Sequence, residues 1–221
     1  MEVINNDMQV RMALLKETGY NVETAKKCWD FVCGETKKQK PTIGRLEDGV
    51  YLINIKGNAV RYNGENTKTV NDIVYIGIVQ GSRSVAISLH DVSKNEITLT
   101  EKESEDDCRG YKNSYMDAVQ DWDGKFNTEL LKKIGLAFYL KNSEYIPSLA
   151  ELYLICINQK VINEALRFVG GQELNDWYWS STEYDGSRAW RLSFNYGGAD
   201  TALKAEYEYN IRPVSTFLPN N

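Results

Sequence analysis

Residues 175–210, NDWYWSSTEYDGSRAWRLSFNYGGADTALKAEYEYN, are the stretch that decides how the chain is interpreted. Nine of these 36 residues are aromatic, whereas Leu192 and Leu203 are the only Leu, Ile, Val or Met residues. An ordinary core strand is rich in β-branched aliphatic residues, so this composition is not typical of one. Aromatic rings interleaved with Gly, Ser, Asn and Asp are typical of binding surfaces, because rings contribute contact area while losing few torsions. The stretch therefore predicts a ligand-binding surface.

Several motifs in and around this stretch carry a family resemblance. They are IPSLAEL at Ile146–Leu152, YWSSTEY at Tyr178–Tyr184, Ala189-Trp190 with Phe194, and IRPV at Ile211–Val214. In this order they resemble the C-type-lectin-like bacterial modules related to formylglycine-generating enzyme. The resemblance is clearest from Tyr145 to Phe217 and weaker back to Gly49. It implies an α+β fold, a C-type-lectin-like domain with twisted antiparallel sheets and a few helices.

Within that family the chain is similar to variable proteins that diversity-generating retroelements diversify in phages and gut bacteria. Adenine-directed mutagenesis rewrites a C-terminal stretch of those proteins, mostly to Asn, Tyr, Ser, Asp, Gly, Ala, Thr and Arg. The resemblance implies a non-catalytic ligand- or receptor-binding protein, with host recognition by a phage as one setting. Its ligand would be a protein or glycan on a target surface, and the family's trimers imply a homo-oligomer.

Two sets of site residues follow from the composition and the motifs. The expected ligand-binding set is Trp177, Tyr184, Asp185, Ser187, Arg188, Arg191, Ser193, Asn195, Tyr196, Asp200 and Thr201. The expected scaffold set is Trp179, Ser180, Ser181, Glu183, Trp190, Phe194 and Arg212. Within the scaffold, Glu183 and Arg212 could form a buried bidentate ion pair that fixes the register of two late strands. Leu192, Lys204, Glu206 and Glu208 depart from the mutable residue types, which leaves the limits of a variable set open.

The beginning of the chain has helical periodicity. Met8, Met12 and Leu15 recur on one helix face before Gly19, and Asn21 can cap a second helix that ends near Gly34. We therefore divide the chain into a helical hairpin appendage with its linker, residues 1–40, and a C-type-lectin-like ligand-binding domain, residues 41–221. The hairpin would dock to another particle or cellular protein, or promote oligomerisation.

From Gly49 onward, strands come first, helices follow, and strands return. The predicted strands are 50–55, 59–62, 73–79, 84–89, 177–181, 189–195 and 209–216, and the predicted helices are 114–120, 127–135, 147–157 and 159–169. Ser148 and Glu151 have the spacing of a capping box. Strands and helices do not alternate, so the order favours an α+β domain over a parallel α/β sheet.

Charge and hydropathy exclude several kinds of partner. The net charge of −5 argues against a non-specific grip on nucleic-acid phosphates. No apolar run approaches the roughly 18 residues that a membrane span needs, so we expect no membrane insertion. The first residues lack the basic and apolar regions of a secretory signal, so we expect cytoplasmic synthesis, with release inside a virion as a further option.

Three other functions are weighed against the binding module. An enzyme of the formylglycine-generating kind would use a redox-active cysteine pair, but Cys108 and Cys156 both lie outside the late motifs, and no cofactor is expected. A calcium-dependent sugar lectin would need an EPN or QPD tripeptide and a WND triplet, which the sequence lacks, so we expect no metal. A structural particle protein would use the same fold for assembly and bury Tyr184, Tyr196 and Tyr207 between subunits.

Overall fold

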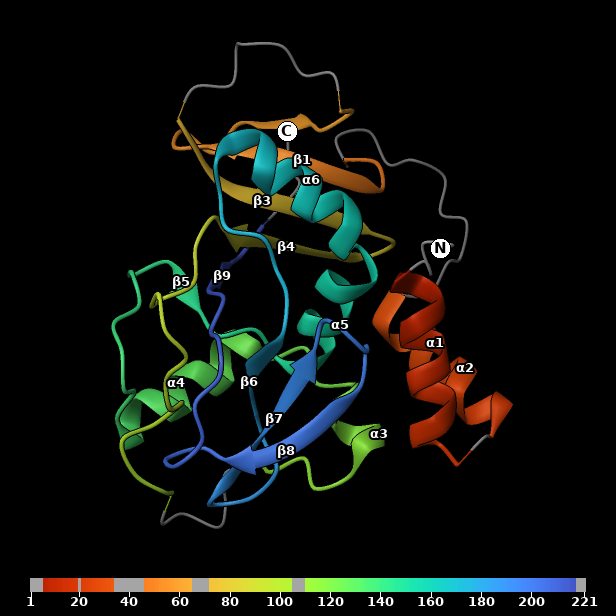
Figure 1. Cartoon of the computed structure of the whole chain (residues 1–221), viewed down its shortest axis with the longest axis vertical. Coiled ribbons are helices and arrows are strands. Elements are labelled where there is room, and N and C mark those ends of the chain that lie inside the picture. Colours follow the sequence, from red (N-terminus) through yellow and green to blue (C-terminus); the bar gives the residue numbers. More distant parts are fainter. Residues whose placement is uncertain (1–5, 20, 34–45, 65–71, 105–109, 218–221) are drawn as a thin grey trace.

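The aliphatic strands form a six-stranded antiparallel sheet in the computed structural model, which describes residues 6–19, 21–33, 46–64, 72–104 and 110–217 (Figure 1). The strand order is β2–β1–β3–β4–β9–β5. The strands are β1 (Gly49–Asn54), β2 (Ala59–Arg61), β3 (Ile73–Gln80), β4 (Arg83–Ser88), β5 (Glu144–Tyr145) and β9 (Val214–Ser215). Val214 pairs with both Ile87 and Tyr145, so the end of the chain returns between two earlier strands.

The aromatic stretch forms a separate three-stranded antiparallel sheet, a meander in the order β6–β7–β8. Its strands are β6 (Trp177–Glu183), β7 (Arg188–Ser193) and β8 (Ala199–Leu203). β8 was not predicted, because Ala and Asp, which have little strand propensity, make up most of this segment, and pairing with β7 decides its conformation. The predicted strand 209–216 is mostly irregular, although Tyr209 and Asn210 make single bridges to Ile97 and Tyr178.

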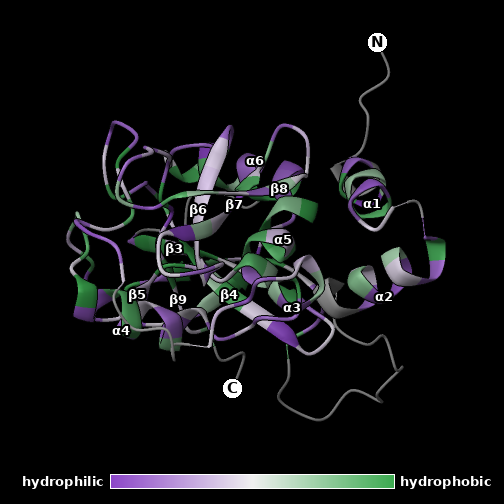
Figure 2. Cartoon of the chain, turned by 90° about the horizontal axis from the view of Figure 1, so that it is seen from below, coloured by the Kyte–Doolittle hydropathy of each residue, from purple (hydrophilic) through white to green (hydrophobic). Residues whose placement is uncertain are grey.

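Helix α5 (Leu149–Ile157) lies between the two sheets, and α6 (Gln159–Val169) follows it across the larger sheet (Figure 1). The predicted capping box is present: the Ser148 hydroxyl accepts from Glu151 N, and the Glu151 carboxylate accepts from Ser148 N. Figure 2 shows α5 as a largely hydrophobic helix at the centre of the molecule, with hydrophilic residues on the outer loops. Two further helices lie beside the smaller sheet, α3 (Tyr115–Ala118) and α4 (Gly124–Ile134), and α4 begins three residues before its predicted start.

The predicted N-terminal hairpin consists of α1 (Asn6–Glu17) and α2 (Val22–Cys33). Both helices contact α5, and Val10, Leu14, Ala25 and Cys28 are buried in the same hydrophobic cluster as the main core. The hairpin is therefore packed on the domain (Figure 1), while the predicted linker after it lies outside the described residues. Among the helices that the structure describes, none is long and apolar enough to cross a membrane.

Candidate ligand-binding face

The two turns of the smaller sheet lie at its opposite ends, which divides the predicted ligand-binding set. The β6–β7 turn holds Tyr184–Ser187, and the β7–β8 turn holds Phe194–Gly198. In a meander, successive turns alternate between the two ends, and β7 has six residues at roughly 3.3 Å each. The two turns are therefore separated by on the order of 20 Å, and they belong to different surfaces.

Near the β7–β8 end, one face of the sheet presents a guanidinium between two aromatic rings. The Arg191 guanidinium carbon lies 4.2 Å from the ring centroid of Trp177 and 4.3 Å from that of Tyr209. Arg191 Nη2 is 3.0 Å from Asp200 Oδ2, on the neighbouring strand. The Asp200 side chain is 60% exposed, whereas the Arg191 side chain is only 16% exposed. We refer to Trp177, Arg191, Asp200 and Tyr209 as the aromatic face.

The β7–β8 turn beside this face contains the most exposed of the predicted residues. Asn195 is exposed and Tyr196 is 67% exposed. Thr201 is half-buried and pairs with Trp190, so it lies on the other side of the sheet from Arg191 and Asp200. Ser193 was predicted to bind the ligand, and this prediction is wrong. Its side chain is fully buried, and its hydroxyl accepts a hydrogen bond from Tyr196 N at 3.3 Å.

At the opposite end of the sheet, the predicted residues of the β6–β7 turn are paired among themselves. The Asp185 carboxylate accepts from the backbone of Ser187 and Arg188, and it forms an ion pair with the Arg188 guanidinium at 2.5 Å. Hydrogen bonds from Arg188 lower the pKa of Asp185, outweighing the effect of burial. Tyr184 is half-buried, packs its ring against Trp190, and is covered by Arg188. The Ser187 hydroxyl donates to Glu103. The side chains of this turn are therefore held by contacts within the turn and with Glu103 and Trp190.

The predicted ion pair between Glu183 and Arg212 is wrong. Glu183 pairs instead with Lys204, and both side chains are buried. The Ser104 hydroxyl donates to Glu183 Oε1 at 3.0 Å and accepts from Lys204 Nζ at 3.0 Å. The register explains this partner, because Arg188 pairs with Leu203 and so brings the residue after β8 to the end of β6. Lys204 is one of the four residues that do not belong to the mutable residue types, and this difference could have indicated its structural role.

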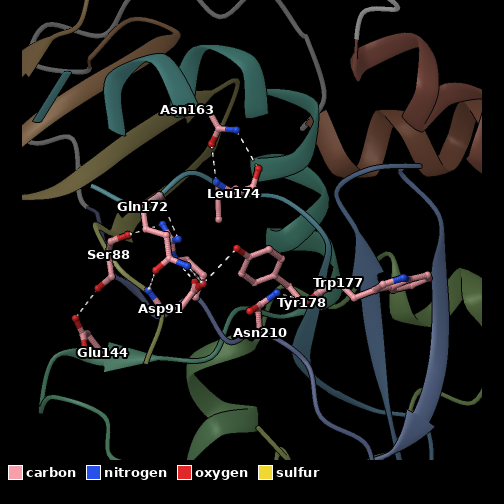
Figure 3. Close-up of polar contacts among 10 residues, drawn as sticks. Ser88, Asp91, Glu144, Asn163, Gln172, Leu174, Trp177, Tyr178 and Asn210 are labelled. Atoms are coloured by element: carbon pink, nitrogen blue, oxygen red, sulfur yellow. Dashed lines mark hydrogen bonds and ion pairs between the residues drawn. The ribbon is translucent and has the colours of Figure 1, made fainter. Parts of the chain in front are cut away.

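Arg212 has a different partner, Asp91, which the sequence did not indicate. Arg212 Nε donates to Asp91 Oδ1 at 2.6 Å, and its terminal nitrogens donate to the carbonyls of Ser88 and Gln172. Both charged side chains are almost fully buried, and burial raises the pKa of Asp91 although Arg212 acts in the opposite direction. Figure 3 shows Gln172 and the Tyr178 hydroxyl directed at Asp91. The cluster joins the end of β4 to the segments before β6 and β9.

The other predicted scaffold residues lie inside the domain. Trp179 is fully buried and donates from its indole to the Ile97 carbonyl, while Trp190 donates to the Lys112 carbonyl. Ser180 and Ser181 are fully buried, and their hydroxyls donate to the carbonyls of Trp190 and Gly124. Phe194 is 2% exposed and contacts the Tyr178 ring. Their burial shows that the aromatic stretch supplies core as well as surface.

Acidic side chains surround the aromatic face. Glu96, Asp176 and Glu208 are all exposed, in the segments next to Ile97, Trp177 and Tyr209. Partial burial, together with repulsion from Asp176 and Glu208, raises the pKa of Glu96. Glu96 and Glu208 directly precede Ile97 and Tyr209, which pair with each other, and Asp176 directly precedes Trp177, so all three carboxylates come from segments beside the aromatic face.

Groups with catalytic or metal-binding potential are placed as follows. Cys28 and Cys156 are buried free thiols, and burial raises the pKa of Cys156 to about 12. The Cys28 thiol donates to Met116 Sδ at 3.0 Å. Cys108 lies outside the described residues. Within the part of the chain that the structure describes, three or more His, Cys, Asp or Glu side chains are nowhere grouped to hold a metal ion.

Comparison of the chain with protein-family models, with curated proteins and with solved structures found no significant match.

Proposed function

We propose that the chain is a non-catalytic binding protein with a C-type-lectin-like domain, and that its ligand lies against the aromatic face and the β7–β8 turn. The proposal rests on one observation in particular. Exposed Tyr196, Asn195 and Asp200 lie next to Trp177 and Tyr209, while the strand residues between them are buried. Aromatic anchors beside adaptable polar groups are the usual make-up of a protein-binding surface.

The C-type-lectin-like part of the proposal is supported by the path of the chain. The path runs from the larger sheet through α5 and α6 into the three-stranded meander, and it then returns to the larger sheet as β9. The motif residues that suggested this family are at structurally decisive positions: Ser148 and Glu151 cap α5, and Arg212 holds the returning segment. A solved structure in which β9 did not return beside β4 would contradict the assignment.

The binding role can be tested with two matched display libraries. One library varies Arg191, Asn195, Tyr196 and Asp200, and the other varies Trp179, Ser180, Glu183 and Trp190. We expect most members of the first library to fold and to yield binders to an immobilised test protein such as streptavidin, because Asn195, Tyr196 and Asp200 are exposed and Arg191 is only partly buried. The second should fold rarely, because its positions are buried. An equal fraction of unfolded members in the two libraries would contradict the placement of the face. So would a third library, varied at Tyr184–Arg188, if it alone yielded binders.

We further propose that this face is diversified by a retroelement. Support comes from the residue types at Asn195, Tyr196, Asp200 and Thr201, which belong to the set reachable by adenine mutagenesis. Sequencing the gene's neighbourhood tests the idea. We expect a reverse-transcriptase gene and a second copy of the segment that differs at adenines, and a neighbourhood with neither would contradict it.

A further inference from the structure

The charges around the aromatic face are not balanced. Arg191, the one arginine within the face, is paired with Asp200. Glu96, Asp176 and Glu208 form no ion pair within the described part of the chain. Lys94 is exposed two residues before Glu96 and forms no ion pair with it in the described part of the chain, whereas Glu96 and Glu208 directly precede the paired residues Ile97 and Tyr209. The face therefore has an excess of negative charge.

The aromatic rings of the same face hold a cation within the molecule. Trp177 and Tyr209 both lie about 4 Å from the guanidinium carbon of Arg191, at the distance of a favourable cation–π contact. Arg191 Nε is buried and has no hydrogen-bond acceptor within the described residues, so the rings take the place of polar partners there. Both rings are half-buried and already stack on Arg191, so the contact that the face offers an incoming guanidinium is bidentate pairing with the open carboxylates.

We infer that this face, together with the acidic side chains of Glu96, Asp176 and Glu208, binds a cationic segment of a partner protein that presents arginine. The inference rests on the proposed binding function and specifies the chemistry of the ligand. Exposed carboxylates repel phosphates, which makes nucleic acids and anionic membranes poor ligands for the same face. Arginine fits better than lysine, because its planar guanidinium can pair with a carboxylate through two parallel hydrogen bonds.

The test is an NMR titration of the whole chain, followed at the indole N–H signals, with the Trp177 signal assigned from Trp177→Phe. The probes are three capped peptides of equal length, Gly-Arg-Gly-Arg-Gly, Gly-Lys-Gly-Lys-Gly and Gly-Glu-Gly-Glu-Gly, at low ionic strength where screening is weakest. We expect the arginine peptide to shift the Trp177 signal, the lysine peptide to do so more weakly, and the glutamate peptide not to do so. Equal shifts with all three peptides, or none, would overturn the inference.

A pair of charge-matched variants separates specific from general attraction. Glu96→Gln with Glu208→Gln should raise the Kd for the arginine peptide about fivefold, as expected for two exposed charge contacts. Asp30→Asn with Glu129→Gln removes the same charge from exposed sites on α2 and α4 and should change the Kd less than about twofold. Equal effects would show only a dependence on net charge.

The two proposals fail in different ways. If the display library at Asn195 and Tyr196 yields binders while the arginine peptide leaves Trp177 unshifted, the binding function stands and the cationic partner is wrong. If the library also yields no binders, both proposals fail.

Discussion

The two sheets of this protein are held in place by different kinds of contact. In the larger sheet, Leu52, Ile76, Ile78 and Ile87 are at most 1% exposed, and aliphatic packing dominates in the core that the sheet forms with α6. At the smaller sheet, the buried ion pair of Glu183 with Lys204 accompanies the core, and a second buried pair, Arg212 with Asp91, joins the segment before this sheet to the end of β4. Aliphatic packing depends on volume, whereas a buried ion pair depends on direction and on complete pairing.

This difference explains how a sheet with few aliphatic residues can keep its position although the polar side chains on its surface can be replaced. The indole and hydroxyl donors of Trp179, Trp190 and Ser180 are directed at backbone carbonyls. Those contacts do not involve the side chains at the β7–β8 turn. Changes at the turn should therefore leave the position of the sheet unchanged, and the following predictions test this, from the largest expected effect to the smallest.

Arg212→Met should have the largest effect. It leaves the Asp91 carboxylate buried without its cation, and breaking a buried pair in this way costs about 3–5 kcal/mol. Urea denaturation would measure the loss in the free energy of unfolding. Adding Asp91→Asn should recover part of it, and Ile87→Val in the larger sheet should cost only about 1 kcal/mol. A loss below about 1 kcal/mol for Arg212→Met would show that the pair is unimportant.

Glu151 should make stability depend on pH, because its buried carboxyl caps the first turn of α5, the helix that packs against β6 and β7 of the smaller sheet. Burial raises the pKa of Glu151 to about 7 from an ordinary value of 4.5. The native state therefore holds a proton between these two values that the unfolded state releases. Its contribution is fully present below about pH 4.5 and is lost as the pH rises through about 7, a change on the order of 3 kcal/mol.

The measurement is the free energy of unfolding of the wild type and of Glu151→Gln at pH 5 and pH 8. The glutamine is neutral at both values; its amide oxygen can accept from Ser148 N, and its amide nitrogen can donate to the Tyr145 hydroxyl, which reverses the direction of that contact. We expect the wild type to lose more stability than the variant on going to pH 8. Parallel losses in the two proteins would contradict the raised pKa.

Gly197→Ala tests the contact between the β7–β8 turn and the N-terminal hairpin. Gly197 has φ of +67°, and an added Cβ would lie 2.9 Å from Val10 Cγ2 and 3.0 Å from Val10 Cα. Strain and this close approach to α1 should cost about 1–2 kcal/mol. Hydrogen exchange in α1 should rise as the hairpin loosens. Gly198→Ala is the matched control, since a Cβ there meets nothing within 4 Å.

Tyr196→Ser should have the smallest effect, since the side chain is 67% exposed. We expect a change in the free energy of unfolding within about 0.5 kcal/mol. Phe194→Ala, two residues earlier and 2% exposed, should cost about 3–5 kcal/mol. Similar losses of stability for the two variants in thermal denaturation would show that the Tyr196 side chain supports the fold as Phe194 does.

The sequence by itself determined the local elements with clear periodic or capping signals. The two N-terminal helices, the first four strands and the Ser148–Glu151 capping box lie where the pattern predicted, because contacts a few residues apart decide them. The aromatic stretch was also correctly expected to form strands around buried Trp179 and Trp190. The short strands β5 and β8 have no such local signal and exist because neighbouring strands pair with them.

Only the tertiary structure decided which charges meet and which exposed residues share a surface. Arg212 and Asp91 are 121 residues apart in the chain, and nothing in the spacing selects Asp91 over any other acidic residue. The 36-residue aromatic stretch predicted a single binding surface, but strand reversal places its two turns at opposite ends of the sheet. Ser193 has the composition of a surface residue and is nevertheless buried, because side-chain direction in a strand is set by pairing and packing.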